Sequence, residues 1–211
     1  MKIGILGGTF DPVHKGHLYI AQETKKCLGL AQVWLMPAAR SPFKQEKKTA
    51  SFEQRFQMIQ QAVQYVPGCF ATQFEGLRGG ISYTVDTLQA LCCLHPQDEF
   101  WFIIGADAYA GFFQWKNPQK ILELVHLAVV SRPGCEIASD LWRNVQGITP
   151  GLAERIHELK LEGMEVSSTY IRQCMERGED EIQFLLPETL AYIRKNGLYK
   201  QDRLNENDKN L

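Results

Sequence analysis

Two histidines near the start of the chain are its clearest candidates for chemistry. His14 and His17 lie three residues apart, so both would face the same way on the first turn of a helix. An apolar segment over residues 3–6 precedes them as a predicted buried strand, which Gly7 and Gly8 end. This order of strand, glycine turn, loop and helix leaves the backbone N–H groups at the helix N-terminus free to bind an anion. Imidazoles beside such a helix start suit charge stabilisation in phosphoryl or nucleotidyl transfer.

The segment does not match the commonest phosphate-binding loops. It lacks the Gly-Lys-[Ser/Thr] of a P-loop, and Gly4, Gly7 and Gly8 do not fall at the G-x-G-x-x-G spacing of a dinucleotide fingerprint. A zinc site would need a third ligand, which no Cys-x-x-Cys pair or third nearby histidine supplies. The remaining alternative is a structural turn that carries two surface histidines.

Residues 7–17 resemble a known signature. They read Gly-Gly-Thr-Phe-Asp-Pro-Val-His-Lys-Gly-His, which is similar to the G-x-F-D-P-x-H-x-G-H motif of the nucleotidyltransferase superfamily. Members of this superfamily join a nucleotide to a phosphorylated substrate. The predicted strand, loop and helix are the context that the motif requires. The resemblance therefore implies an enzyme that transfers a nucleotidyl group.

Length and composition favour one domain. The chain has 211 residues and 45% hydrophobic content, enough for one core over residues 1–200, with a helical portion from about residue 151. Residues 201–211 are polar and are expected to form a disordered tail. A net charge of −1 predicts no nucleic-acid partner, and no apolar run is long enough to cross a membrane. The six cysteines lack metal or redox spacing and no signal peptide is recognisable, which favours reduced cysteines in the cytoplasm.

Strands and helices alternate along most of the chain. Strands are expected over residues 3–6, 33–37, 69–74, 100–104 and 126–130, and helices over 16–28, 51–66 and 84–94. Later segments predict a helix over 152–159, a last strand over 164–166, and helices over 167–176 and 187–195. This order predicts an α/β fold with a doubly wound, Rossmann-like parallel sheet and a small C-terminal helical part. Ligands of such sheets bind at the carboxyl ends of the strands, where the strand order switches.

Two further motifs follow predicted strands in the first half of the chain. Lys44 lies in the loop after the second strand, where it could bind a phosphate as a mobile point charge. Taken alone, the segment is better explained as a solvated basic loop with Lys47 and Lys48. Thr84 opens a helix whose first N–H groups would suit a carboxylate. The alternative there is an ordinary helix start.

Two more motifs lie in the second half. Gly105 and Asp107 follow the fourth strand, where the glycine permits close approach of an adenosine and the carboxylate can accept from ribose hydroxyls. Trp115 could stack on a cationic ring, although aromatic residues more often pack in a core. Ser167 and Arg172 open a late helix with groups that suit phosphates, or they are an N-cap serine and a surface arginine.

Together these motifs resemble the bacterial nicotinate-nucleotide adenylyltransferases, and the resemblance covers Ile3 to about Tyr199. Its distinctive parts are the first motif, S-Y-T-V-D-T-L at 82–88, G-A-D-A at 105–108 before F-x-x-W, S-R-P-G at 131–134 and S-S-T-Y-I-R at 167–172. The resemblance implies transfer of an adenylyl group from ATP to nicotinate mononucleotide, giving nicotinate adenine dinucleotide and pyrophosphate, the penultimate step to NAD. Nicotinamide mononucleotide or pantetheine phosphate as the acceptor, and a non-catalytic nucleotide-binding regulator, are the alternatives.

The family pattern also implies roles for single residues. His14, His17, Lys44 and Arg172 would be catalytic, with Mg²⁺ held mainly by the ATP phosphates rather than by the protein. The implied ATP site comprises Gly7, Gly8, Thr9, Phe10, His17, Gly105, Asp107, Arg132, Ser167, Ser168, Thr169 and Arg172. The implied mononucleotide site comprises Asp11, Lys44, Tyr83, Thr84, Asp107, Trp115 and the backbone N–H of Lys116. Phe43 stands where the family often has histidine. Lys116 stands where an aromatic residue is common, and this difference would remove the side-chain role at position 116. A homodimer is left open.

Overall fold

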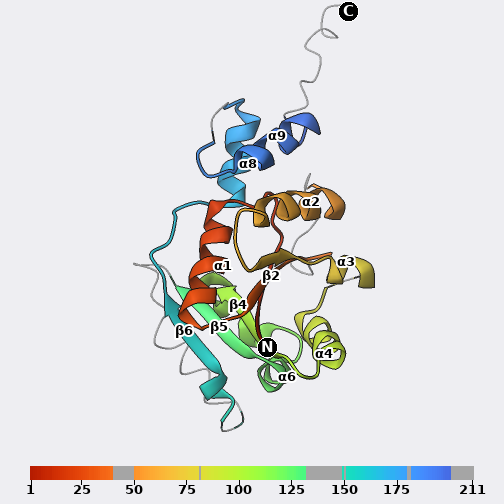
Figure 1. Ribbon diagram of the computed structural model, residues 1–211, viewed down its shortest axis with the longest axis vertical. Helices are drawn as coiled ribbons and strands as arrows, with labels where there is room; N and C mark the ends of the chain where they lie inside the picture. Colours follow the sequence, from red (N-terminus) through yellow and green to blue (C-terminus); the bar gives the residue numbers. More distant parts are fainter. Residues whose placement is uncertain (40–49, 81, 132–148, 150, 180–181, 201–211) are drawn as a thin grey trace, which may run out of the picture.

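The computed structural model describes residues 1–39, 50–80, 82–131, 149, 151–179 and 182–200. Within them six parallel strands form one sheet in the order β3-β2-β1-β4-β5-β6 (Figure 1). The strands are β1 (Lys2–Gly8), β2 (Gln32–Pro37), β3 (Cys69–Ala71), β4 (Glu99–Gly105), β5 (His126–Ser131) and β6 (Ile156–Lys160). The predicted α/β fold with a doubly wound parallel sheet is confirmed.

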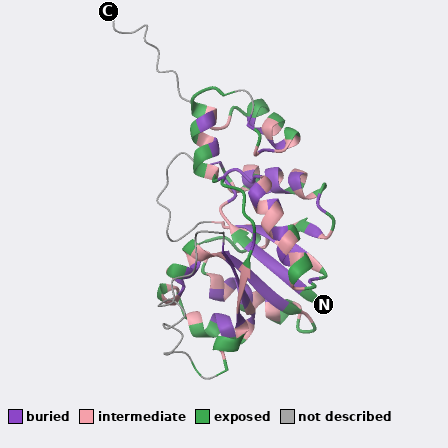
Figure 2. Cartoon of the chain, turned by 90° about the vertical axis from the view of Figure 1, so that its left-hand side faces the viewer, coloured by how far each residue is buried: buried purple, intermediate pink, exposed green. Residues whose placement is uncertain are grey.

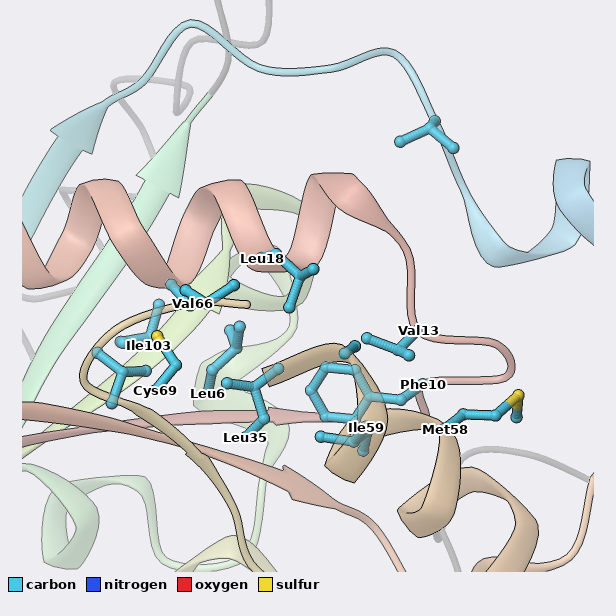
Figure 3. Close-up of a cluster of buried hydrophobic side chains, with 14 of the residues drawn as sticks. Leu6, Phe10, Val13, Leu18, Leu35, Met58, Ile59, Val66, Cys69 and Ile103 are labelled. Carbon is cyan, nitrogen blue, oxygen red and sulfur yellow. The ribbon is translucent and has the colours of Figure 1, made fainter. Parts of the chain in front are cut away.

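Alternate residues of each strand face two separate apolar clusters. In β1 the side chain of Leu6 joins the cluster under α1 (Lys15–Cys27) and α2 (Phe52–Val63), while Ile5 joins the cluster under α4 (Thr84–Leu94) and α6 (Pro118–Leu124). Figure 3 shows Leu6 with Leu35 of β2 and Leu18 of α1 in the first cluster. Because helices cover both faces, the central strands are apolar throughout rather than alternating. Figure 2 shows the resulting band of buried residues along the sheet.

The strand order switches between β1 and β4. From β1 the chain winds outward through β2 and β3, then crosses back to β4 and winds outward the other way. Leu6 pairs with Ile103, so the carboxyl ends of β1 and β4, at Gly8 and Gly105, lie next to each other. This is the place where a doubly wound sheet binds its ligand.

The C-terminal helices lie at the same end of the molecule as the carboxyl ends of the strands. In Figure 1, α8 (Ser168–Glu176) and α9 (Pro187–Lys195) stand above the sheet, and α9 packs against α2. Beyond α9, the hydroxyl of Tyr199 donates to Asp11 at 2.6 Å. The end of the described chain is therefore fastened to the first loop.

The predicted helix over residues 152–159 is wrong. The segment forms a short 3₁₀ turn, η3 (Ala153–Arg155), and then the edge strand β6. Leu152, Ile156 and Leu159 stand at helical spacing, but Ile156 pairs with Leu127 of β5 and buries its side chain against the sheet. Pairing with a neighbouring strand outweighs a short local pattern.

Several other boundaries also differ from the predictions. β1 continues through Gly7 and Gly8, so these glycines belong to the strand and do not break it. Residues 164–166 form no strand, and β3 ends at Ala71, before the unpredicted helix α3 (Phe74–Arg78). The short elements α5 (Ala106–Ala110) and η1 (Phe112–Gln114) and the helix α6 were also not predicted.

The described part of the chain contains no helix that is both long enough and apolar enough to cross a membrane. The predicted tail over residues 201–211 lies outside the described residues.

Candidate active site

A cleft of about 430 Å³ opens at the carboxyl ends of β1 and β4. Its walls come from the first loop and α1, the ends of β2 and β4, the start of α4 and the segment before α8. The predicted site residues that line it are Gly7, Gly8, Thr9, His14, His17, Thr84, Gly105, Asp107, Trp115, Ser167 and Ser168. Motifs from the two ends of the chain, as far apart as Gly7 and Ser168, thus meet in one cavity.

Other predicted residues do not line the cleft. These are Phe10, Asp11, Tyr83, Lys116, Thr169 and Arg172, all close in sequence to residues that do. Lys44 and Arg132 lie outside the described residues, as does Phe43. The cleft is also lined by Glu75, which the sequence analysis missed, and by Ser82 and Thr87 of the motif at 82–88, to which it gave no role.

The two histidines form a stacked pair at the start of α1. Their ring centroids are 3.7 Å apart with an interplanar angle of 28°, and the ring of Phe10 meets His17 edge-on at 4.9 Å. The backbone N–H of His14 donates to Nδ1 of His17 at 3.3 Å. Because Nδ1 accepts this hydrogen bond, the ring proton of neutral His17 lies on Nε2, which makes that atom a donor. His14 is only 6% exposed, so the alternative of two surface histidines is wrong.

A glycine between the histidines lets the segment before α8 approach them. A Cβ on Gly16 would stand 2.9 Å from Cγ1 of Val166 and 3.1 Å from Nδ1 of His14. Any side chain there would push apart the two walls of the cleft or turn the His14 ring. Gly105 has a similar role at β4, where a Cβ would lie 2.5 Å from Oδ1 of Asp107.

Asp11 supports the first loop from below the cleft. Its side chain is 1% exposed, and Oδ1 accepts from the Ala50 N–H at 3.0 Å and from the Tyr199 hydroxyl at 2.6 Å. Burial and the neighbouring Asp11 carboxylate raise the pKa of Tyr199, which keeps its hydroxyl protonated as a donor. The Asp11 carbonyl accepts from Nη1 of Arg172 at 2.6 Å, and Nη2 of Arg172 donates to Thr169 at 3.2 Å. These contacts hold the loop and Arg172 in place.

Ser167 and Ser168 begin α8 where it meets the first loop. The Ser167 hydroxyl accepts from the N–H of Tyr170 at 3.1 Å and so caps the helix. The Ser168 hydroxyl donates to the carbonyl of Pro12 at 2.9 Å. The N-cap alternative is therefore correct for Ser167, and both residues nevertheless line the cleft.

Arg55 is a buried residue that the sequence analysis missed. Its guanidinium donates to the carbonyls of Thr9 at 2.7 Å, Ala38 at 2.9 Å and Ala50 at 3.2 Å. It therefore joins the loop after β1, the loop after β2 and the start of α2. Burial lowers the pKa of Arg55, and the nearby Asp11 carboxylate is the main group that opposes this shift. Arg55 comes three residues after Phe52 and so lies on the apolar face of α2. A charged residue on that face was the signal in the sequence that Arg55 is buried.

The opposite end of the cleft is built from β2 and α4. The Ala39 N–H is shared between Oγ of Ser82 at 3.1 Å and Oε2 of Glu75 at 3.3 Å, and the Thr87 hydroxyl donates to Oε1 of Glu75 at 3.0 Å. Among the described residues, no acceptor lies within hydrogen-bond range of the Thr84 N–H at the first turn of α4. The first N–H groups of this helix are therefore candidates to bind an anion.

Trp115 forms a side wall near this helix start. Its indole packs against Phe102 at 6.3 Å in an edge-on arrangement and against Phe112 at 5.6 Å. These contacts fix the ring while leaving it on the cleft surface. The tryptophan is thus both packed and available to a ligand.

Known proteins resemble this chain over most of its length. Residues 5–174 match the family model described as cytidylyltransferase-like. A probable nicotinate-nucleotide adenylyltransferase of Desulfitobacterium hafniense is 38% identical over 203 residues, which cover 94% of this chain and 96% of that protein. The corresponding protein of Herpetosiphon aurantiacus is 36% identical over 199 residues, covering 94% and 98%.

A solved structure shares the fold. The nicotinic acid mononucleotide adenylyltransferase of Plasmodium falciparum, complexed with NaAD, matches with a TM-score of 0.76 at 20% identity, covering 94% of this chain and 97% of that one. At this identity the likeness concerns the fold, whereas the sequence matches above establish kinship. This chain therefore belongs to the cytidylyltransferase-like family and, within it, to the nicotinate-nucleotide adenylyltransferases.

Proposed function

We propose that this chain transfers the adenylyl group of ATP to nicotinate mononucleotide, producing nicotinate adenine dinucleotide and pyrophosphate. The observation that carries the proposal is one cleft with the His14–His17 pair on one wall and the open start of α4, beside Trp115, on another. The first wall suits phosphates, and the second suits a pyridinium ring that bears a carboxylate. Relatives that match almost the whole chain carry the corresponding name.

The reaction needs positioning and charge stabilisation more than proton transfer. A phosphate oxygen of the mononucleotide forms a bond to the α-phosphorus of ATP, and the bond from that phosphorus to pyrophosphate breaks. The attacking oxygen is already anionic at neutral pH, so no general base is required. His17, as a donor through Nε2, and His14 would stabilise charge on the transferred phosphate, together with Arg172, which is held against the first loop by its bond to the Asp11 carbonyl.

The remaining assignments extend this proposal. Gly7, Gly8, Thr9, Phe10, Gly105, Asp107, Ser167, Ser168 and Thr169, with Arg132, would hold ATP, while Tyr83, Thr84, Trp115 and the Lys116 N–H, with Lys44, would hold the mononucleotide. Asp11 would act by holding the loop. Mg²⁺ would bind the ATP phosphates and neutralise their charge. Among the described residues no group of three or more His, Cys, Asp or Glu side chains is placed to hold a metal ion. Free cysteines such as Cys69 and Cys174 fit the cytoplasm.

Acceptor selectivity tests the proposed function. The N–H groups at the start of α4 only donate, so they favour a carboxylate, whereas the NH₂ of a carboxamide would face another donor. Helix attraction of about 0.3–2 kcal/mol and an unpaired-donor cost of about 1–3 kcal/mol predict roughly 10- to 10³-fold preference for nicotinate. The measurement is pyrophosphate release from ATP with nicotinate mononucleotide, nicotinamide mononucleotide and pantetheine phosphate, compared as kcat/KM.

The same assay with Trp115→Ala separates ring stacking from carboxylate binding. Both pyridine acceptors are pyridinium cations, so loss of the indole is expected to weaken both alike and leave their ratio nearly unchanged. Equal use of the two acceptors by the wild type would contradict the carboxylate pocket. No pyrophosphate release with any acceptor would favour a regulatory nucleotide-binding protein.

Arg172→Lys tests the assignment of the late helix to ATP. Lysine keeps the charge but loses the planar fork that donates to Asp11 and Thr169 at once. We expect weaker use of ATP, with binding of nicotinate mononucleotide largely retained, measured by calorimetry for each substrate. A loss confined to the mononucleotide would place Arg172 at the other substrate.

A further inference from the structure

The side chain of Lys116 crosses from the loop after Trp115 to the first turn of α4. Its Nζ lies 2.8 Å from Oδ2 and 3.1 Å from Oδ1 of Asp86, and it also lies over the ring of Tyr83, 4.6 Å from the centroid. Both partners flank Thr84, which lines the cleft. One ammonium thus makes a two-oxygen ion pair and a cation–π contact beside the proposed carboxylate pocket.

The charge of Asp86 would otherwise oppose that pocket. A carboxylate in the first turn of a helix is stabilised by the same dipole that attracts an external anion, and it repels that anion. Asp86 is the acidic residue in the first turn of α4. Two other acids, Glu75 and Asp107, line the cleft, but neither lies in the first turn of α4. Glu75 accepts hydrogen bonds from the Ala39 N–H and the Thr87 hydroxyl. The Lys116 ammonium therefore offsets the negative charge of Asp86 at the start of α4.

We propose that Lys116 contributes to acceptor specificity by neutralising Asp86, so that the start of α4 accepts the carboxylate of nicotinate more readily. This inference rests on the proposed function and adds a side-chain role to a residue that the family pattern assigned only a backbone one. Lys116 acts through Asp86 and the helix start and is a positioning residue, not a catalytic one. Because the pair is half-exposed, its influence is modest and screened by salt.

The experiment compares kcat/KM for nicotinate and nicotinamide mononucleotides in the full chain at saturating ATP. Lys116→Met keeps the length of the side chain but removes its charge, and it is expected to lower the nicotinate-to-nicotinamide ratio about two- to fivefold. The loss should appear in KM for nicotinate mononucleotide and shrink at high ionic strength. Lys116→Arg, the conservative control, should keep the ratio.

The double variant Lys116→Met with Asp86→Asn decides the mechanism. Removing the uncompensated carboxylate should restore the ratio, because the repulsion is gone. A ratio unchanged by Lys116→Met, an equal loss for both acceptors, or no restoration in the double variant would overturn the role of Lys116 while leaving the proposed function intact. A wild type that uses neither acceptor, or both equally, would overturn the proposed function as well.

Discussion

His17→Ala is expected to lower kcat by roughly 10²–10³-fold, the usual scale for the loss of one donor that stabilises a transition state. The ring lies in the cleft, stacked on His14 and held edge-on by Phe10. Its Nδ1 is occupied by the His14 N–H, so Nε2 is the atom that would meet the transferred phosphate. The measurement is steady-state pyrophosphate release at saturating ATP and acceptor.

Loss of the helix cap must be separated from loss of the catalytic donor. The Nδ1 hydrogen bond satisfies the N-cap N–H of α1, so His17→Ala is also expected to cost about 1 kcal/mol of stability. His17→Asn is the matched control, since its amide oxygen can replace Nδ1 but its side chain does not reach the position of Nε2. We expect His17→Asn to be nearly as stable as the wild type and as inactive as His17→Ala. An asparagine variant with near wild-type kcat would remove Nε2 from the mechanism.

The central sheet could be predicted because its signals are local. Buried parallel strands such as β4 are continuous apolar runs, and Gly105 marks the end of that strand in the sequence itself. The first motif is also local, since all its residues fall between Gly7 and His17. The alternation of strands and helices, together with this motif, predicted a ligand site at the carboxyl ends of the strands, which is where the cleft lies.

The parts that were missed depend on contacts between distant segments. β6 is an edge strand, and its pairing with β5 decides that this segment is a strand and not a helix. The missed helix α3 has only five residues and ends at Gly79, which has a positive φ of 67°. Glu75 belongs to no recognisable motif. It is held in the cleft by hydrogen bonds that its carboxylate accepts from the Ala39 N–H and the Thr87 hydroxyl. The motif predicted that Asp11 binds the mononucleotide, but it gave no sign of the contacts that Asp11 makes with Ala50, Arg172 and Tyr199.

Arg55 is the missed residue whose removal is expected to have the largest effect on stability. Arg55→Met keeps much of the apolar stem but deletes all three donors to the carbonyls of Thr9, Ala38 and Ala50. Hydrogen bonds from a charged donor contribute about 1.5–3 kcal/mol each, and buried acceptors left without a donor add to the loss. Since such terms are not fully additive, we expect the free energy of unfolding to fall by at least about 3 kcal/mol.

Urea denaturation monitored by tryptophan fluorescence measures this loss, with two variants for comparison. Arg55→Lys is expected to recover only part of it, because one ammonium cannot match a planar fork aimed at three loops. Arg78→Met removes an exposed arginine whose side chain donates to Thr87 in the described part of the chain, and it should change the unfolding free energy far less. If Arg55→Met unfolds at the same urea concentration as the Arg78→Met control, the guanidinium does not hold the three loops together. If the expected loss is found, kcat should fall with it even under conditions where the variant is folded, because the loops after β1 and β2 carry the walls of the cleft.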